Sequence, residues 1–175
     1  MISFDPVTAL LAGLAGTIAM TAMMQAATAI GMTRMPSMTL IQGLMLTDDV
    51  ERAKRIGALT HVVMMGTVVF GLGYAGIFTL LDDASLATGA VLGLAHGIAA
   101  GLAMTMMGSI HPRMVAPAAM SGARDGAVAT LTGGEPTLVA PGLFARNYGP
   151  MTPVGLVMGH VLFGLVVALV YGALA

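Results

Sequence analysis

Four long stretches without Lys, Arg, Asp or Glu constrain this chain more than any other feature. They run over residues 7–32, 56–81, 86–110 and 152–175. A helix needs about 20 apolar residues to cross roughly 30 Å of hydrocarbon, and lipid offers backbone polar groups no partner outside a helix or a closed barrel. The sequence therefore predicts an all-α fold, a four-transmembrane-helix bundle, with 1–175 as a single membrane domain.

Composition excludes several classes of protein. Only 9% of the residues are charged, whereas soluble domains carry about 25%. The 7 Lys and Arg against 8 Asp and Glu argue against a nucleic-acid partner. The absence of cysteine excludes disulfides and thiolate chemistry. We therefore expect the lipid bilayer, and no nucleic acid, as the environment of this chain.

The first stretch could be read as a secretory signal peptide. However, residues 1–5 carry no basic side chain, and the apolar run is longer than a signal peptide allows. We interpret it as a retained helix.

All the basic residues lie in two loops, at about 33–55 and 111–151. The positive-inside rule places such loops in the cytoplasm. This predicts a multi-pass protein of the cell (inner) membrane, with both termini on the non-cytoplasmic side and an outer turn at Asp82–Asp83. The basic residues are Arg34, Arg52, Lys54, Arg55, Arg113, Arg124 and Arg146.

Both loops carry further signals. Ser37 precedes a short amphipathic pattern at 38–45, which predicts a helix lying in the membrane interface. Asp48 and Glu51 have capping-box spacing and predict an early start for the second helix. The loop at 111–151 is rich in Gly and Pro, and long loops of this kind are usually functional or mobile.

The two halves of the chain look related. Gly-Leu-Ala occurs at 13–15 and again at 93–95, and His61 in the second stretch matches His160 in the fourth. Two related helical hairpins form a parallel repeat of the kind known in transporters. The alternative is chance similarity between helices rich in Gly, Ala and Val.

Glycines recur on the third and fourth stretches. Small residues let membrane helices approach closely, so these positions predict a tight bundle, with a partner in the same chain or another. A flat surface for a planar cofactor is the alternative. The glycines are Gly89, Gly93, Gly97, Gly101, Gly155, Gly159 and Gly164.

Histidines are the only ionisable groups within the stretches, and such groups are candidates for function. With a rise of about 1.5 Å per residue, His61 and His160 fall at similar depths, whereas His96 would need a tilted or kinked helix to join them. Imidazoles could bind haem b or Cu(I) or relay protons. Alternatively, each is a neutral histidine hydrogen-bonded to a neighbouring helix, with Thr17, Thr21 and Gln25 as intramembrane polar candidates.

Methionine makes up 17 of the 175 residues. Met64 follows His61 and Met158 precedes His160, which suggests a Cu(I) site of thioethers and imidazoles. Met20 and Met24 have the spacing of a methionine pair on one helix face. The alternative is that methionine fills the core as a flexible apolar side chain.

No catalytic motif is evident. The chain contains neither Gly-x-Ser-x-Gly nor His-Glu-x-x-His, so enzymatic activity is uncertain, with the sequence leaning against it. The first expectation is an accessory or scaffolding subunit of a homo-oligomer or membrane complex. The alternatives are a histidine-based cofactor protein with haem b or Cu(I), and a small transporter or channel.

Several ordered segments resemble a known but uncharacterised family. They are 12–21, His61, 89–97 with His96, His111–Pro112, 142–144, 147–149 and 159–172. The chain is similar over most of its length to small four-helix bacterial membrane proteins classed as a domain of unknown function. The resemblance implies a four-helix integral membrane protein and no particular activity.

Overall fold

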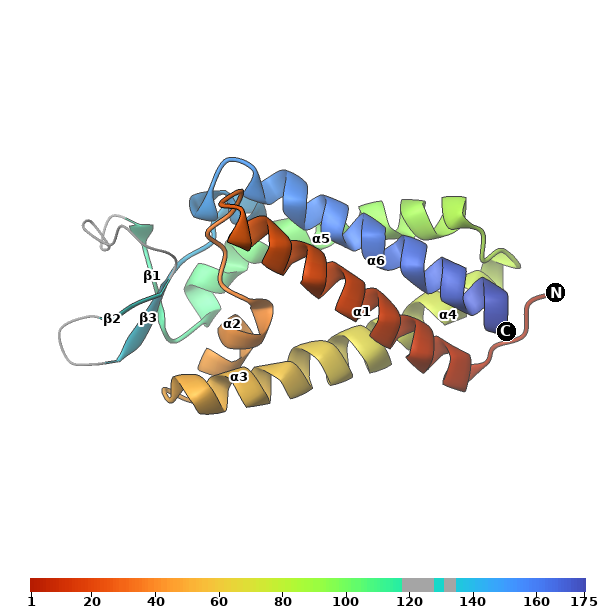
Figure 1. The fold of residues 1–175 in the computed structure, drawn as a ribbon, viewed down its shortest axis with the longest axis horizontal. Helices are drawn as coiled ribbons and strands as arrows, with labels where there is room; N and C mark the ends of the chain where they lie inside the picture. Colours follow the sequence, from red (N-terminus) through yellow and green to blue (C-terminus); the bar gives the residue numbers. More distant parts are fainter. Residues whose placement is uncertain (118–127, 131–134) are drawn as a thin grey trace.

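Within the part of the chain that the structure describes, four helices are long and apolar enough to cross a membrane, and they form the body of the protein. The computed structural model describes residues 1–117, 128–130 and 135–175, so Arg124 of the second basic loop lies outside the described residues. The predicted all-α, multi-pass architecture is confirmed (Figure 1). The crossings are α1 (Pro6–Ala29), a continuous second helix made of α3 (Val50–Ala58), the π-helix η1 (Leu59–Phe70) and α4 (Gly71–Leu81), then α5 (Leu86–Ile110) and α6 (Thr152–Leu174).

The helix ends differ slightly from the predicted boundaries. α1 ends at Ala29 rather than at 32, and Gly31 just beyond it adopts a φ of 77° that redirects the chain. The second crossing does start early, at Val50, but its cap is Asp49 and not Asp48. The Asp49 carboxylate accepts the backbone N–H of Arg52 at 2.8 Å, which satisfies one of the free donors at a helix start.

Both termini lie at one end of the bundle, which we call the terminal end (Figure 1). The turn between α4 and α5 is there too, because the N–H of Ile2 donates to the Asp82 carboxylate at 2.6 Å. Asp82 takes a left-handed conformation that ends α4, and Ser85 caps α5. The Asp83 carboxylate accepts bonds from Ser85 and Thr88, which lower the pKa of Asp83. The opposite end carries both long loops, and we call it the loop end.

Helix α6 packs between α1 and α5, and glycine allows the close approach. A Cβ at Gly93 would overlap the carbonyl oxygen of His160, and one at Gly164 would overlap that of Gly89. On its other side, α6 places Gly159 against the Met20 side chain of α1. The glycines of α5 and α6 therefore meet partners within this chain.

The terminal half of the bundle has an aromatic core. Tyr74 packs edge-to-face against Phe163 with ring centroids 5.2 Å apart. Phe78 lies 5.9 Å from Tyr171, whose hydroxyl donates to the Ser3 carbonyl at 3.0 Å. That bond holds the N-terminal segment over the end of the bundle.

The loop end contains a small sheet that the sequence did not predict. Its strand order is β1-β3-β2, with β1 parallel to β3 and β2 antiparallel to it. A 3-10 segment, η3 (Leu143–Tyr148), then leads into α6. The strands are β1 (Met114–Val115), β2 (Val128–Thr130) and β3 (Pro136–Val139).

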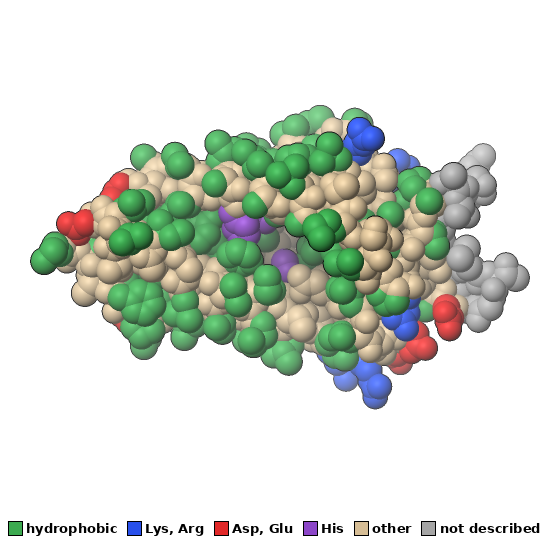
Figure 2. Space-filling model, turned by 180° about the vertical axis from the view of Figure 1, so that it is seen from behind, with side chains coloured by type: hydrophobic (Ala, Val, Ile, Leu, Met, Phe, Trp, Pro, Cys, Tyr) green, Lys and Arg blue, Asp and Glu red, His purple; other side chains and the backbone are tan. Residues whose placement is uncertain are grey.

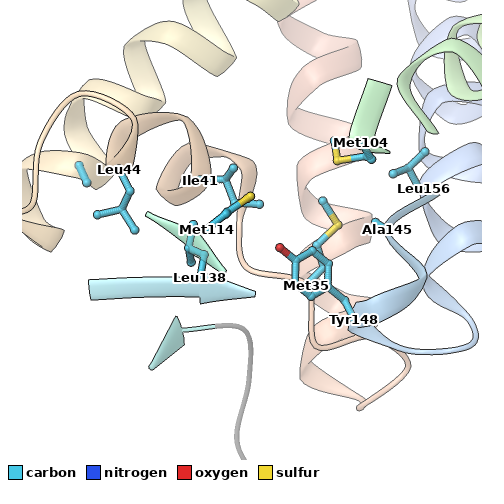
Figure 3. Packing of buried hydrophobic residues seen from close by; sticks show 10 residues of the cluster. Met35, Ile41, Leu44, Met104, Met114, Leu138, Ala145, Tyr148 and Leu156 are labelled. Carbon is cyan, nitrogen blue, oxygen red and sulfur yellow. The ribbon is translucent and has the colours of Figure 1, made fainter. Parts of the chain in front are cut away.

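The predicted short helix exists as α2 (Met38–Leu44), capped by Ser37, but its apolar face is buried in protein rather than in lipid. Ile41 and Leu44 are fully buried and lie over Leu138 and Met114 of the sheet (Figure 3). On the other side, Gly43 of α2 packs directly on the backbone of α3 at Ala53. The helix is thus clamped between the sheet and α3.

Candidate functional site

A cavity of about 390 Å³ lies in the loop half of the membrane body. Its walls come from the second half of α1, the segment that leads into α2, and η1. Twelve residues line it. The methionines are Met20, Met24, Met35 and Met38, and the polar residues are Thr21, Gln25, Thr28, Ser37, Thr39 and His61. We call this space the methionine cavity.

Each wall is positioned by local structure. Met20 and Met24 are one turn apart on α1, and their side chains lie against Gly159 and Gly155 of α6. Gly31 turns the chain, and Thr33 then bonds to Thr152 through hydroxyls 2.7 Å apart, which holds the next segment against α6. The following segment supplies Met35 and Met38 to the cavity wall.

His61 is the only one of the three predicted intramembrane histidines that lines the cavity. The Gln42 side-chain amide donates to its Nδ1 at 3.2 Å, so α2 orients the imidazole. His61 lies in η1, whose 12 residues form a π-helix. Such segments are rare and are found disproportionately at functional sites. The proposed repeat pairs the second crossing with α6, but α6 is a regular α-helix, so the two helices differ here.

The structure separates the predicted copper ligands. The side chains of Met64 and Met158 are 50% and 51% exposed on the outside of the bundle, and neither lines the cavity. Met158 is two residues from His160, a spacing that points to opposite faces of an α-helix. Met64 is three residues from His61, but a π-helix turn takes more residues than an α-helix turn, so the two do not share a face. Met64 and Met158 therefore do not join His61 and His160 in the predicted set.

His96 and His160 contact each other in the middle of the bundle, with ring centroids 4.5 Å apart. The expected difference in depth was wrong because α5 extends beyond the start of α6 at the loop end. Gly97 lies level with Val157 and His160, and Gly101 already meets Phe144 of η3. The last two turns of α5 thus project past α6 (Figure 1).

Both of these histidines have neighbours within the protein. The Tyr74 hydroxyl lies 3.3 Å from His96 Nδ1, and His160 Nδ1 donates to the Leu156 carbonyl at 2.8 Å. Phe70 packs against the His96 ring at 4.0 Å. Figure 2 shows histidine side chains between the helices, midway along a face otherwise covered mainly by hydrophobic groups.

The pair His96 and His160 leaves no room for a haem between its imidazoles, because the two rings are in direct contact. The methionine cavity itself has a single histidine, His61. Within the described residues, no three His, Asp or Glu side chains form a group that could hold a metal ion. Any metal in the cavity would therefore depend on thioether ligands.

A small transporter or channel would need a polar path along Thr17, Thr21, Gln25 and His96, but neither Thr17 nor His96 lines the cavity. Thr21 and Gln25 line the cavity, but Thr17 is buried, donates to the Gly13 carbonyl at 2.7 Å and packs on Gly66 of η1. The tight contact between Thr17 and Gly66 packs α1 directly on η1, one turn of α1 beyond Thr21.

His111 and Arg113 fasten α2 to the end of α5. His111 Nε2 donates to the Ile41 carbonyl at 2.9 Å and Nδ1 accepts the Arg113 N–H at 3.1 Å. The Arg113 guanidinium donates to the Leu44 carbonyl at 2.5 Å. Burial lowers the pKa of His111, and Arg113 lowers it further, although the Ile41 bond opposes them. The neutral imidazole is therefore the form that holds α2.

We expect acid to loosen this attachment. The unfolded chain takes up a proton at His111 as the pH falls below 6.5, whereas the folded chain resists it, so stability present above pH 6.5 is lost as the pH falls through the lower folded pKa. His111→Asn keeps a donor and an acceptor without titrating. The thermal midpoint in detergent should fall less between pH 7.5 and 5 for this variant than for the parent chain. Equal falls would contradict the role of His111.

Residues 4–123 match the model of a family described as a "Family of unknown function (DUF6789)". The matched segment covers more than half of the chain and contains every residue of the methionine cavity. No curated protein and no solved structure matches. The predicted relation to an uncharacterised domain is confirmed, and its bacterial origin stays a prediction. This chain belongs to DUF6789, a family of unknown function.

Proposed function

We propose that this protein binds a small ligand in the methionine cavity, as a membrane-embedded binding protein rather than an enzyme. The cavity itself carries the proposal. Ligand sites are concave, mostly apolar and furnished with a few convergent polar groups. Here four methionine side chains surround a space that also receives Thr21, Gln25 and His61.

The ligand reaches the cavity from the cytoplasm. All Lys and Arg residues of the sequence fall in the two loops, and the basic side chains visible in Figure 2 gather at the loop end. The positive-inside rule then puts the loop end in the cytoplasm and both termini outside the inner membrane. The close packing of Thr17 on Gly66 beside the cavity favours a binding site over a continuous channel.

A role as an accessory subunit of an oligomer or larger membrane complex stays a prediction. The glycines that motivated it on α5 and α6 pack against this chain itself: Gly93 meets α6, Gly164 meets α5, and Gly101 meets Phe144. They therefore give no reason to invoke a second subunit.

Cysteine labelling tests the cavity directly, because the chain has no native cysteine. Thr21→Cys places a thiol on the cavity wall, whereas Thr17→Cys, one turn away on α1, places it where the side chain is 1% exposed. A small, water-soluble methanethiosulfonate reagent should modify Thr21→Cys in membranes much faster than Thr17→Cys. Comparable rates at the two positions would overturn the proposal.

A filled cavity supplies the control. Ala29 also lines the cavity, so Ala29→Trp should slow the labelling of Thr21→Cys. Ala22→Trp, at an exposed position of α1 that does not line it, should leave the rate unchanged. If both tryptophans slow the reaction equally, the reagent is not entering through this space.

A further inference from the structure

We propose that the ligand of the methionine cavity is Cu(I), held by Nε2 of His61 and by up to three thioethers drawn from Met20, Met24, Met35 and Met38. The inference rests on the proposed function, since it names the ligand of the same cavity. This ligand set differs from the one predicted from closeness in the sequence, which was His61, His160, Met64 and Met158. Only His61 belongs to both sets.

The donor atoms favour a soft monovalent cation. Thioether and imidazole ligands select Cu(I), whereas no carboxylate lines the cavity to neutralise a hard or divalent ion. All the donors are uncharged, so the site must accommodate the whole charge of the ion in an apolar environment. A single positive charge costs least to desolvate there.

The methionines gather around the cavity from two segments of the chain. Four of the 12 lining residues are methionine, compared with 17 of 175 in the whole sequence. Met20 and Met24 come from one face of α1, while Met35 precedes α2 and Met38 begins it. Met35 also belongs to the buried core at the loop end, and Met24 and Met38 pack against that core, so the packing of the protein holds these side chains at the cavity wall.

His61 is held in the manner of a metal ligand. Ligating histidines almost always use the second ring nitrogen for a hydrogen bond that fixes the ring. Gln42 already contacts Nδ1 and donates to it, so in the absence of metal the imidazole proton is on Nε2 and the ring is oriented through Nδ1. When Nε2 binds Cu(I), the imidazole proton moves to Nδ1, and the Gln42 amide turns so that its oxygen accepts it. No proton is gained or lost overall.

Anaerobic titration of the full chain in detergent, with bicinchoninate competing for Cu(I), tests the assignment. We expect one Cu(I) per chain and an X-ray absorption spectrum with both sulfur and nitrogen ligands. The double variant Met20→Leu/Met24→Leu nearly conserves side-chain volume and should weaken binding by about 100-fold, while Gln42→Leu should weaken it by about 10-fold, at the low end of what losing an outer-shell partner costs.

Met64→Leu/Met158→Leu is the matched control, because both side chains are half-exposed outside the cavity. It should leave the Cu(I) affinity unchanged. No Cu(I) binding, a spectrum without sulfur, or equal losses in the two double variants would each overturn the copper assignment. Rapid labelling of Thr21→Cys together with no Cu(I) binding would refute copper alone, whereas slow labelling would refute the binding cavity as well.

Discussion

Gly57→Val should detach α2 from α3 and cost at least about 3 kcal/mol of unfolding free energy, at the upper end of the range for overpacking. Gly57 lies directly on the carbonyl of Thr39, and Gly43 lies in the same way on that of Ala53. A side chain at Gly57 overlaps backbone, which cannot rotate away. The two helices must therefore separate, and Met38 and Thr39 leave the cavity wall with α2.

Thermal unfolding in detergent and limited proteolysis measure this effect. The variant should have a lower midpoint and new cleavage between α2 and α3. Gly73→Val is the control, because no atom lies within 4 Å of a Cβ at that position of α4, and its stability should change by less than about 1 kcal/mol. Equal stability of the two variants would refute the α2–α3 contact.

Gly164→Val should separate α5 from α6 with an effect of similar size. Gly164 packs on the Gly89 carbonyl and on the Gly93 backbone, so the Cβ and two methyl groups of valine overlap backbone and push the two helices apart. Overpacking at such a site typically costs about 1–3 kcal/mol or more. The contact between His96 and His160 on the same helix pair should be lost as well.

Gly155→Val on the same helix is the control for this variant. A Cβ at Gly155 would meet only the flexible Met24 thioether, at 4.0 Å. We expect Gly164→Val, and not Gly155→Val, to lower the unfolding midpoint and the yield of folded protein. If Gly155→Val is as damaging, the cause is the introduction of valine into α6 rather than its contact with α5.

The four-helix architecture could be predicted because it depends on the absence of charged side chains, which holds at every position of a span. The absence of charged residues over 86–110 predicted a helix there, and α5 has the same first and last residues as that stretch. The early start of the second crossing was also predicted from an acidic capping residue. The predicted cap was Asp48, and the observed cap is the next residue, Asp49. Such local signals need no knowledge of what packs against the helix.

Features that depend on packing escaped prediction. The close approach of Gly43 and Gly57 arises only once residues 45–49 reverse the chain, and no periodic glycine pattern marks it. Strands β1 and β3 are too short to show alternation and pair across residues far apart in sequence. The register of His96 against His160 was missed because the ends of α5 and α6 were assumed to be level.

The candidate site was predictable only in part. His61, Thr21 and Gln25 were recognised as polar groups within the membrane, and all three line the cavity. Among its methionines, Met20 and Met24 were recognised by their spacing on one helix face, and both line the cavity. Met35 and Met38 were not distinguishable from the other methionines, because closeness to histidine along a helix does not measure closeness in space. Gln42 was missed because it lies on α2, outside the expected spans.

The labelling rate of Thr21→Cys relative to Thr17→Cys tests the central claim, a ligand cavity in the loop half of the bundle, most directly. The structure predicts rapid modification at position 21, negligible modification at 17, and slower modification at 21 when Ala29→Trp fills the cavity. Equal rates at the two positions, unaffected by Ala29→Trp, would contradict it.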